Sequence, residues 1–356
     1  MPSGTDSATR EISRRGSIKK SITNLLVVTG DHAAYDATKP GGRYSDEDFE
    51  AHRIMSEAFA AMDDFNVTVC ADHEWLLDGL RASPPDLVVN FCDTGFRNVA
   101  VHEHVLPAYL DMLGIPYTGA QPAAMALCYD KQIVRLLADA LGVAVPRETF
   151  LPGAGDAQMP GFYPALIKPN RADGSVGITK DSVIHNEAEA RAYLAWLREA
   201  LPGCEALYQE YLPGPEYGIG AIGNPETNLR ILPMLEVDFS GLPDGLNPIL
   251  SYESKALPDS PYWTDIVFKR ASAGRELEAA LADDCRRLFQ RLGLRDYGRF
   301  DFRCADDGTP RLMEVNPNPA WGYDAKLVLM AGFAGISYPD MLRLIVEAAA
   351  TRLSQA

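Results

Sequence analysis

A chain of 356 residues is too long for one compact core and predicts two or three domains. Its composition, 47% hydrophobic and 23% charged, is that of a soluble globular protein. The formal net charge of -16 argues against general nucleic-acid binding, because phosphate groups would be repelled, although a nucleotide held by a few local cations is compatible with it.

The cysteines and the amino-terminal segment favour a cytoplasmic protein. The six cysteines are scattered without a CxxC pair, which favours reduced thiols over a disulfide framework or a zinc site. No apolar stretch approaches the length of a membrane span. Residues 1–21 are rich in Ser, Arg and Lys and lack the apolar segment of a signal peptide, so we expect a disordered tail there.

The first predicted domain, residues 22–120, alternates strand patterns with helical ones. Strands are predicted at 24–31, 65–71 and 86–92, and helices at 46–62 and 101–114. Such alternation predicts a parallel sheet with helices on its faces, which is an α/β domain.

Two further domains are predicted at 121–208 and 209–356, and both mix helices with strands in an α+β manner. The first contains predicted helices at 130–142 and 187–201 and strands at 163–169 and 206–212. The second contains predicted strands at 217–223, 229–239, 296–304 and 311–316, a long helix at 275–293 and a closing helix at 338–353.

The stretch LMEVNPNPAW ends a strand-like apolar run in an acid and an amide. Residues i and i+2 of a strand point to the same face, so Glu314 and Asn316 would lie side by side with Val315 turned into the core. Oxygen ligands of this kind suit a hard cation such as Mg²⁺. The alternative is a polar strand end that runs into a proline-rich turn.

The stretch IKPNRADGSVGI places Lys168 at the end of an apolar strand, before a loop with glycines and a serine. Glycines let backbone amides approach phosphate oxygens, and Lys168 adds a cation. Because the lysine precedes the glycines, this is not a GxxxxGK[ST] loop, and a flexible surface hairpin is the alternative.

A third stretch, GRFDFR, alternates Arg299, Asp301 and Arg303 with phenylalanines, so the charged side chains share one face. An ordinary strand with a solvated face would have the same pattern. Only nine residues separate FDFR from MEVN, however, and this spacing suits two adjacent strands joined by a turn. Asp301 would then join Glu314 and Asn316 around shared cations.

Taken in order, these lysines, arginine, acids and amide resemble the ATP-grasp superfamily, and within it the D-alanine–D-alanine ligases. The resemblance runs from about residue 86 to 350 and includes GIPYTGAQPAAMALCYDK, IKPNRADGSVG, YQEYLPGPEY, YESK, GRFD and MEVN. It implies the ATP-grasp fold, with an N-terminal parallel-sheet α/β domain followed by central and C-terminal α+β ATP-grasp domains.

The resemblance also implies a role for each matching residue. ATP would be bound by Lys131, Lys168, Ser175, Gln209, Glu210, Tyr211, Leu212, Glu216 and Lys255, with Glu216 on the ribose hydroxyls. The catalytic residues would be Arg299, Lys255 and Ser175. The metal ligands would be Asp301, Glu314 and Asn316, around two Mg²⁺ ions for which Mn²⁺ could substitute.

Departures from the family concern the substrates. The glutamate that holds the first amino acid's ammonium group in the D-alanine ligases has no counterpart here, and only Asp31 or His32 lies nearby. After EVN, Ala320, Trp321 and Lys326 replace a glycine–methionine turn and serines, which indicates a different acceptor that is still an acid. Core packing is the alternative for Trp321, and a solvated helix face is the alternative for Lys326.

Three further residues are candidate substrate contacts. The family places substrate-facing residues near the start of the predicted helix at 101–114, which suggests His102 or Glu103. A metal pair formed by His102 and His104 is disfavoured, because residues i and i+2 do not share a helix face. Tyr252, close to Lys255 in the sequence, is the third candidate.

Together these features predict an ATP-dependent carboxylate–amine ligase that joins two amino-acid-like substrates through an acyl phosphate and releases ADP and phosphate. Specialised metabolism is one setting for such a reaction. One alternative is a D-alanine–D-alanine ligase of the cell wall, which the altered N-terminal loop disfavours. The alternative of another class is a catalytically idle ATP-binding regulator, which the full set of lysines and ligands disfavours. The expected partners are small-molecule carboxylates and amines, without nucleic acid or membrane, and a homodimer is compatible with the sequence.

Overall fold

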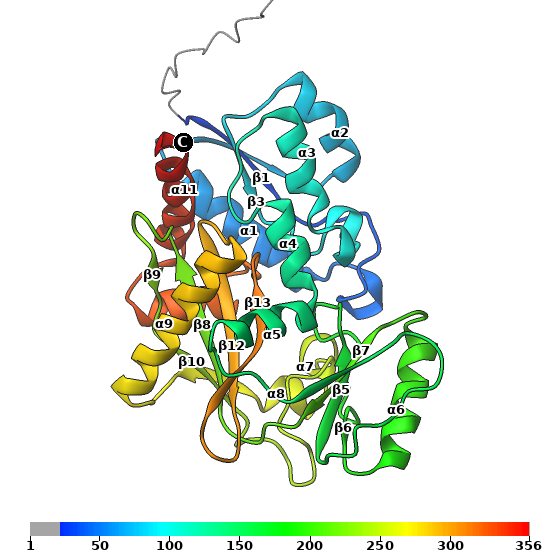
Figure 1. Cartoon of the computed structure of the whole chain (residues 1–356). Coiled ribbons are helices and arrows are strands. Elements are labelled where there is room, and N and C mark those ends of the chain that lie inside the picture. The colour runs from blue at the N-terminus through cyan, green and yellow to red at the C-terminus, as the bar shows by residue number, and fades with distance from the viewer. Residues whose placement is uncertain (1–21, 356) are drawn as a thin grey trace, which may run out of the picture.

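The N-terminal unit is built on a parallel sheet, as its alternating pattern predicts (Figure 1). A computed structural model describes residues 22–355, and the predicted tail at 1–21 lies outside the described residues. The sheet order is β2-β1-β3, with β1 (Asn24–Val28), β2 (Asn66–Cys70) and β3 (Leu87–Asn90) all parallel. The helices are α1 (Asp46–Ala60), α2 (His73–Ala82) and α3 (Val105–Leu113), with short 3-10 turns η1 (Pro40–Gly42), η2 (Phe96–Asn98) and η3 (Ala100–His102).

This sheet is buried on both faces, because successive side chains of a strand point in opposite directions. Leu25 and Val27 of β1 pack in a core that includes α1. Leu26 and Val28 pack in a second core that includes α2 and α3. The continuous apolar run of β1 is therefore explained by helices on both of its sides.

The central unit consists of two helices and an antiparallel sheet. Helices α4 (Pro122–Tyr129) and α5 (Lys131–Ala140) lead into β4 (Glu148–Leu151), β5 (Ala165–Pro169), β6 (Val183–Ile184) and β7 (Ala206–Glu210). The sheet order is β4-β7-β5-β6, and α6 (Glu187–Ala200) packs on it. Strand β7 belongs to this sheet and continues two residues beyond the predicted domain boundary at 208.

The C-terminal unit contains a larger sheet with helices on both faces. Its strands are β8 (Glu216–Ile222), β9 (Arg230–Ile231), β10 (Leu235–Asp238), β11 (Val267–Arg270), β12 (Tyr297–Cys304) and β13 (Pro310–Asn316). They follow the order β11-β10-β8-β12-β13, and β9 pairs with β8. The helices are α7 (Glu253–Ala256), α8 (Pro261–Thr264), α9 (Arg275–Leu292), α10 (Lys326–Phe333) and α11 (Tyr338–Gln355).

One predicted strand, 229–239, is broken in the structure. Residues 232–234 separate β9 from β10, and Pro233 lies in the break. Proline has no backbone N–H to donate to a neighbouring strand, which explains the interruption. Within residues 22–355 no single helix has the length and apolar character to cross a membrane, and only the bent pair of α10 and α11 passes that test together, by length and composition alone.

The first and last parts of the described chain share one hydrophobic core. Helix α11 packs on α1, so residues of the N-terminal sheet and of α10 and α11 belong to the same cluster. The fully buried Asp296 reinforces this junction. Its carboxylate accepts hydrogen bonds from Gly119 N at 2.9 Å, from Asn224 Nδ2 at 2.9 Å and from Arg352 Nη2 at 2.8 Å.

We expect Asp296→Asn to lower the free energy of unfolding by about 1–3 kcal/mol, because the amide cannot satisfy three donors and leaves Arg352 without its buried counter-charge. Asp296 has a φ of 65°, which asparagine tolerates. The substitution therefore tests the loss of the charge without adding backbone strain. Urea denaturation would measure the difference, with Asp306→Asn on an exposed turn as the control. An unchanged unfolding midpoint for Asp296→Asn would contradict the junction role.

Candidate functional site

A cleft of about 1620 Å³ is lined by residues of all three units. It contains every residue predicted above to bind ATP or metal, namely Lys131, Lys168, Ser175, Gln209, Glu210, Tyr211, Leu212, Glu216, Lys255, Arg299, Asp301, Glu314 and Asn316. Of the predicted substrate residues, Glu103, Trp321 and Lys326 line the cleft as well. His102 and Tyr252 are not among its lining residues, and neither are Asp31 and His32.

The acids and the amide come together because β12 and β13 pair in antiparallel register. Arg299 lies opposite Asn316, and Asp301 lies opposite Glu314, which is the adjacency that the short spacing of the two motifs predicts. A register shift between Asp301 and Phe302 then lets the strands continue with a different pairing. Asp301 accepts hydrogen bonds from Arg299 Nη2 at 2.9 Å and from Asn316 Nδ2 at 3.2 Å.

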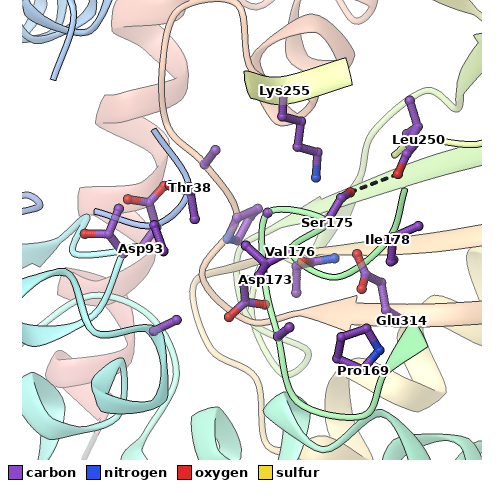
Figure 2. A pocket seen from close by; sticks show the side chains of 18 of the residues that line it. Thr38, Asp93, Pro169, Asp173, Ser175, Val176, Ile178, Leu250, Lys255 and Glu314 are labelled. Atoms are coloured by element: carbon purple, nitrogen blue, oxygen red, sulfur yellow. Dashed lines mark hydrogen bonds between the residues drawn. The ribbon is translucent and has the colours of Figure 1, made fainter. Parts of the chain in front are cut away.

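Glu314 is a carboxylate on which several cations of the cleft act, and Figure 2 shows it in the same opening as one of them, Lys255. Its Oε2 lies 3.7 Å from Lys131 Nζ, and its Oε1 lies 4.0 Å from Arg299 Nη2. Burial acts to raise the pKa of Glu314, but the charges of Lys131, Arg299, Lys255 and Lys168 outweigh it and lower the pKa to about 2. The side chain is therefore an anion throughout the neutral range.

The three lysines whose charges lower this pKa come from separate elements. Lys131 is the first residue of α5, and its Nζ donates to the carbonyl oxygen of Ala172 at 2.5 Å. Lys168 lies in β5 and is almost fully buried, and burial lowers its pKa. Lys255 lies in α7, where burial and then the neighbouring charge of Lys326 lower its pKa to about 8. Such an arrangement of cations is suited to binding a polyanion.

The donor set fits a hard divalent cation in its chemistry, because carboxylate and amide oxygens are the ligands that Mg²⁺ prefers. In the structure, however, both oxygens of Asp301 accept from Arg299. No group of three or more His, Cys, Asp or Glu residues positioned to hold a metal ion occurs among residues 22–355. A cation at this place would use Asp301, Glu314 and the amide oxygen of Asn316, and Arg299 would have to release Asp301.

The residues predicted to lie near the nucleotide base and ribose make contacts within the protein. Gln209 donates to Glu148 Oε2 at 2.8 Å. Glu210 accepts from Arg147 N at 2.7 Å and forms an ion pair with Arg311. Glu216 Oε2 lies 3.3 Å from Arg303 Nη1. The side chain of Glu210 is thus already engaged.

The loop at 170–177 contacts both other units across the cleft. Gly174, Ser175 and Gly177 have positive φ values of 62°, 59° and 74°, so this turn depends on glycine at two of its positions. The Ser175 hydroxyl donates to the carbonyl oxygen of Leu250 at 2.9 Å (Figure 2). A Cβ atom on Gly174 would lie 2.9 Å from Thr38 Cγ2, so the loop also touches the N-terminal unit.

The comparison with protein families decides to which family this chain belongs. Residues 157–347, more than half of the chain, match the family described as "D-ala D-ala ligase C-terminus". The chain belongs to this family. It is an ATP-grasp ligase family, so the resemblance of the motifs and the fold that they implied are both confirmed.

Relatives of this ligase-family chain are distant. The uncharacterized protein y4sG of Sinorhizobium fredii is 29% identical over 314 residues, which cover 84% of this chain and 88% of that protein. The D-alanine–D-alanine ligase of Haemophilus influenzae is 29% identical over 247 residues, which cover 67% of this chain and 76% of that protein.

Solved structures show the same fold in other ligases. The D-alanine–D-alanine ligase from Bacillus anthracis complexed with ATP has a TM-score of 0.69 at 19% identity. The aligned region covers 94% of this chain and 100% of that ligase. The VanG D-Ala:D-Ser ligase from Enterococcus faecalis has a TM-score of 0.66 at 18% identity, and the aligned region covers 92% of this chain and 100% of that ligase. At these identities the likeness establishes the fold of this ligase-family chain.

Several cleft residues of this family member were not found by sequence reasoning. Asp36, Asp93 and Asp173 line the cleft, and Thr38 meets the loop at 170–177. The first two lie in irregular segments after β1 and β3, where neither a period nor a motif marks them. Asp173 lies within the quoted glycine loop, and its position next to Gly174 was the only available signal.

Proposed function

We propose that this protein is an ATP-dependent carboxylate–amine ligase that joins two amino-acid-like substrates. The observation that carries the proposal is the convergence of Lys131, Lys168, Lys255 and Arg299 on one carboxylate, Glu314, inside the cleft. Arg299 also pairs with Asp301, and Lys131, Lys255 and Arg299 act on Asp173 as well. The three lysines have no ion pair within residues 22–355 closer than the 3.7 Å between Lys131 Nζ and Glu314 Oε2, which suits the triphosphate of ATP.

The reaction follows from the chemistry of a carboxylate, which does not react with an amine at a useful rate. The γ-phosphoryl group of ATP passes to a carboxylate oxygen and gives an acyl phosphate and ADP. The amine then attacks the carbonyl carbon, phosphate leaves and the nitrogen loses a proton. Arg299, which lines the cleft, would stabilise the oxyanion that forms during the attack, and Ser175 with its loop would exclude water from the acyl phosphate.

Metal ions would be held by Asp301, Glu314 and Asn316 in this proposal. Mg²⁺, when bound, would neutralise charge on the transferring phosphoryl group. The lysines would bind and orient the phosphates, and the predicted adenine and ribose contacts would be made by Gln209, Glu210, Tyr211, Leu212 and Glu216. The proposal is tested by ADP release in the presence of Mg²⁺ across paired amino acids and related acids, and no release with any pair would contradict it.

An idle ATP-binding regulator is disfavoured by the same charges. A regulator that only binds ATP has no need of an arginine held beside the acids by an ion pair, as Arg299 is to Asp301 at 2.9 Å. ATP binding without ADP release in the paired screen would favour the regulator.

We expect D-alanine alone to be a poor substrate pair. Trp321 is 8% exposed, stacks on Phe91 at 5.8 Å and still lines the cleft, so it fills space at the acceptor end. Lys326 lines the cleft without an ion-pair partner among the described residues, which suits an acidic acceptor group. Another acid–amine pair should exceed D-alanine with D-alanine by at least about tenfold in kcat/KM. The highest kcat/KM for D-alanine alone would make the protein a cell-wall ligase.

We also expect the loop at 170–177 to open without nucleotide and to close over ATP. Its side-chain hydrogen bond to the C-terminal unit is that of Ser175 with Leu250, whereas Lys131 and Asp130 hold it within its own unit. Exposed Arg171 offers a trypsin site. Cleavage there should be at least about tenfold slower with ATP and Mg²⁺, because protection follows the population of the closed form. Lys168→Met should abolish that protection, and equal cleavage of the unaltered protein with and without ATP would rule out a lid.

A further inference from the structure

One end of the cleft carries four carboxylates, which we call the acidic wall: Asp36, Asp93, Glu103 and Asp173. Asp36 and Asp93 come from loops of the N-terminal unit, Glu103 lies just before α3, and Asp173 belongs to the loop at 170–177. Figure 2 shows Asp93 on the N-terminal side of the opening, with Asp173 between it and Glu314. The acidic wall therefore faces the space beyond the lysines proposed to bind ATP.

Three cations at the N-terminal end of the cleft already have other partners. Among the described residues, Lys39 pairs with Asp48 at 2.5 Å, Arg97 pairs with Glu74 at 2.5 Å and Arg171 pairs with Asp130 at 2.7 Å. None of the four carboxylates of the wall forms an ion pair within the described part of the chain. Lys131, Lys255 and Arg299 act on Asp173 from a distance, and Lys39 acts on Asp93. The negative charge of the wall is thus only partly compensated, which is costly in a partly buried cleft.

Asp36 gives independent evidence for a missing partner. The residue is 1% exposed, and its Oδ1 accepts hydrogen bonds from Thr38 N at 2.8 Å and from Thr38 Oγ1 at 2.7 Å. Its Oδ2 is buried and has no hydrogen-bond partner. A buried carboxylate oxygen without a donor is destabilising, and a donor supplied by a ligand would remove that cost.

The electrostatics of the wall agree with this geometry. Burial raises the pKa of Asp93 to about 6. Burial and the charges of Asp173 and Asp93 raise the pKa of Glu103 well above its ordinary value. The rings of Tyr44 and Trp321 line the same cleft.

We propose, on the basis of the ligase function proposed above, that the acidic wall binds a second cationic group of one substrate, an ammonium or guanidinium other than the amine that reacts. A single α-ammonium group requires one carboxylate, whereas the wall presents four. The substrate class that fits is a basic amino acid or a diamino acid, with its charged side chain among Asp36, Asp93 and Glu103.

The test is a binding measurement with matched probes. The cationic probes are lysine and ornithine, and their neutral counterparts are norleucine and norvaline, respectively. Both enantiomers of each probe would be titrated into the full protein with Mg²⁺ and a non-hydrolysable ATP analogue. Isothermal titration calorimetry should give at least one cationic probe a Kd at least about tenfold below that of its neutral counterpart. Asp93→Asn and Glu103→Gln should each abolish that preference. Glu47→Gln, which removes a charge from the exposed rim of the same cleft, should leave it unchanged.

The outcomes separate this inference from the ligase proposal. Equal binding of cationic and neutral probes, tighter binding of the neutral ones or no binding of any probe would overturn the inference, even if ADP release with some other pair supports the ligase. A cationic preference that survives both Asp93→Asn and Glu103→Gln would also overturn it. Selective binding of a cationic probe without ADP release in any pair would support the inference and contradict the ligase.

Discussion

Replacement of Glu314 by Gln is expected to reduce ADP release by about 10²- to 10³-fold, because it removes a carboxylate on which Lys131, Arg299, Lys255 and Lys168 all act. With a pKa lowered to about 2, Glu314 is ionised at every pH at which the protein would be assayed. Glutamine has the same shape and keeps one oxygen, so the loss would report the charge. Steady-state ADP release with the best substrate pair would measure the effect.

Two controls keep this result interpretable. Circular dichroism of Glu314→Gln should match that of the unaltered protein, since the residue is half-buried at the cleft and not in the core. Glu236 on β10 does not line the cleft, and its Oε1 lies 3.6 Å from Lys269 Nζ. Glu236→Gln should therefore retain full turnover. In a direct titration, Mn²⁺ should bind more weakly to Glu314→Gln than to the unaltered protein, and Glu236→Gln should bind it as the unaltered protein does. Unaltered turnover and Mn²⁺ affinity in that variant would remove Glu314 from the metal site.

The strands that carry the site could be predicted because their chemistry is periodic. Charged and apolar residues alternate along β12, and β13 ends in an acid and an amide at positions i and i+2. The nine-residue separation of the two motifs then leaves little choice but a hairpin, and the structure pairs Asp301 with Glu314. Local pattern and short spacing together were sufficient here.

Helix α2 could have been predicted and was not. Asp72 precedes it as an N-cap whose side chain accepts from Glu74 N and Trp75 N, and Leu76 and Leu80 are spaced four residues apart on its buried face. These are ordinary helix signals in a short segment. The segment YESK, in contrast, was recognised for its lysine, and its single helical turn, α7, has no periodic signal.

Apart from Glu103, which was a candidate substrate contact, the acidic wall could not be predicted from the sequence. Asp36 and Asp93 lie in loops after β1 and β3, and these loops meet only because both strands are parallel and end at the same edge of the sheet. Arg97 and Asn98, in the second loop, have positive φ values of 55° and 56°, a conformation that no local pattern indicates. Side-chain directions in such loops depend on contacts that are distant in the sequence.

Lys255 connects the ATP end of the cleft to the acceptor end, and its substitution should have a second large effect. Lys255→Met is expected to lower kcat/KM for ATP by about 10²- to 10³-fold through loss of a cleft-lining cation that is proposed to bind the phosphates. In the unaltered protein, burial and then Lys326 disfavour the charged form, so Lys255 is protonated below a pKa of about 8 and loses its charge as the pH rises through that value.

The plot of kcat/KM for ATP against pH should therefore fall by about tenfold per pH unit above 8, since kcat/KM reports the free enzyme. Lys326→Met removes the like charge and should shift the fall to higher pH, whereas Lys180→Met, on the exposed end of the loop after β5, should leave the profile unchanged. A profile that stays flat up to pH 10 in the unaltered protein would show that the charge on Lys255 is not what binds the phosphates.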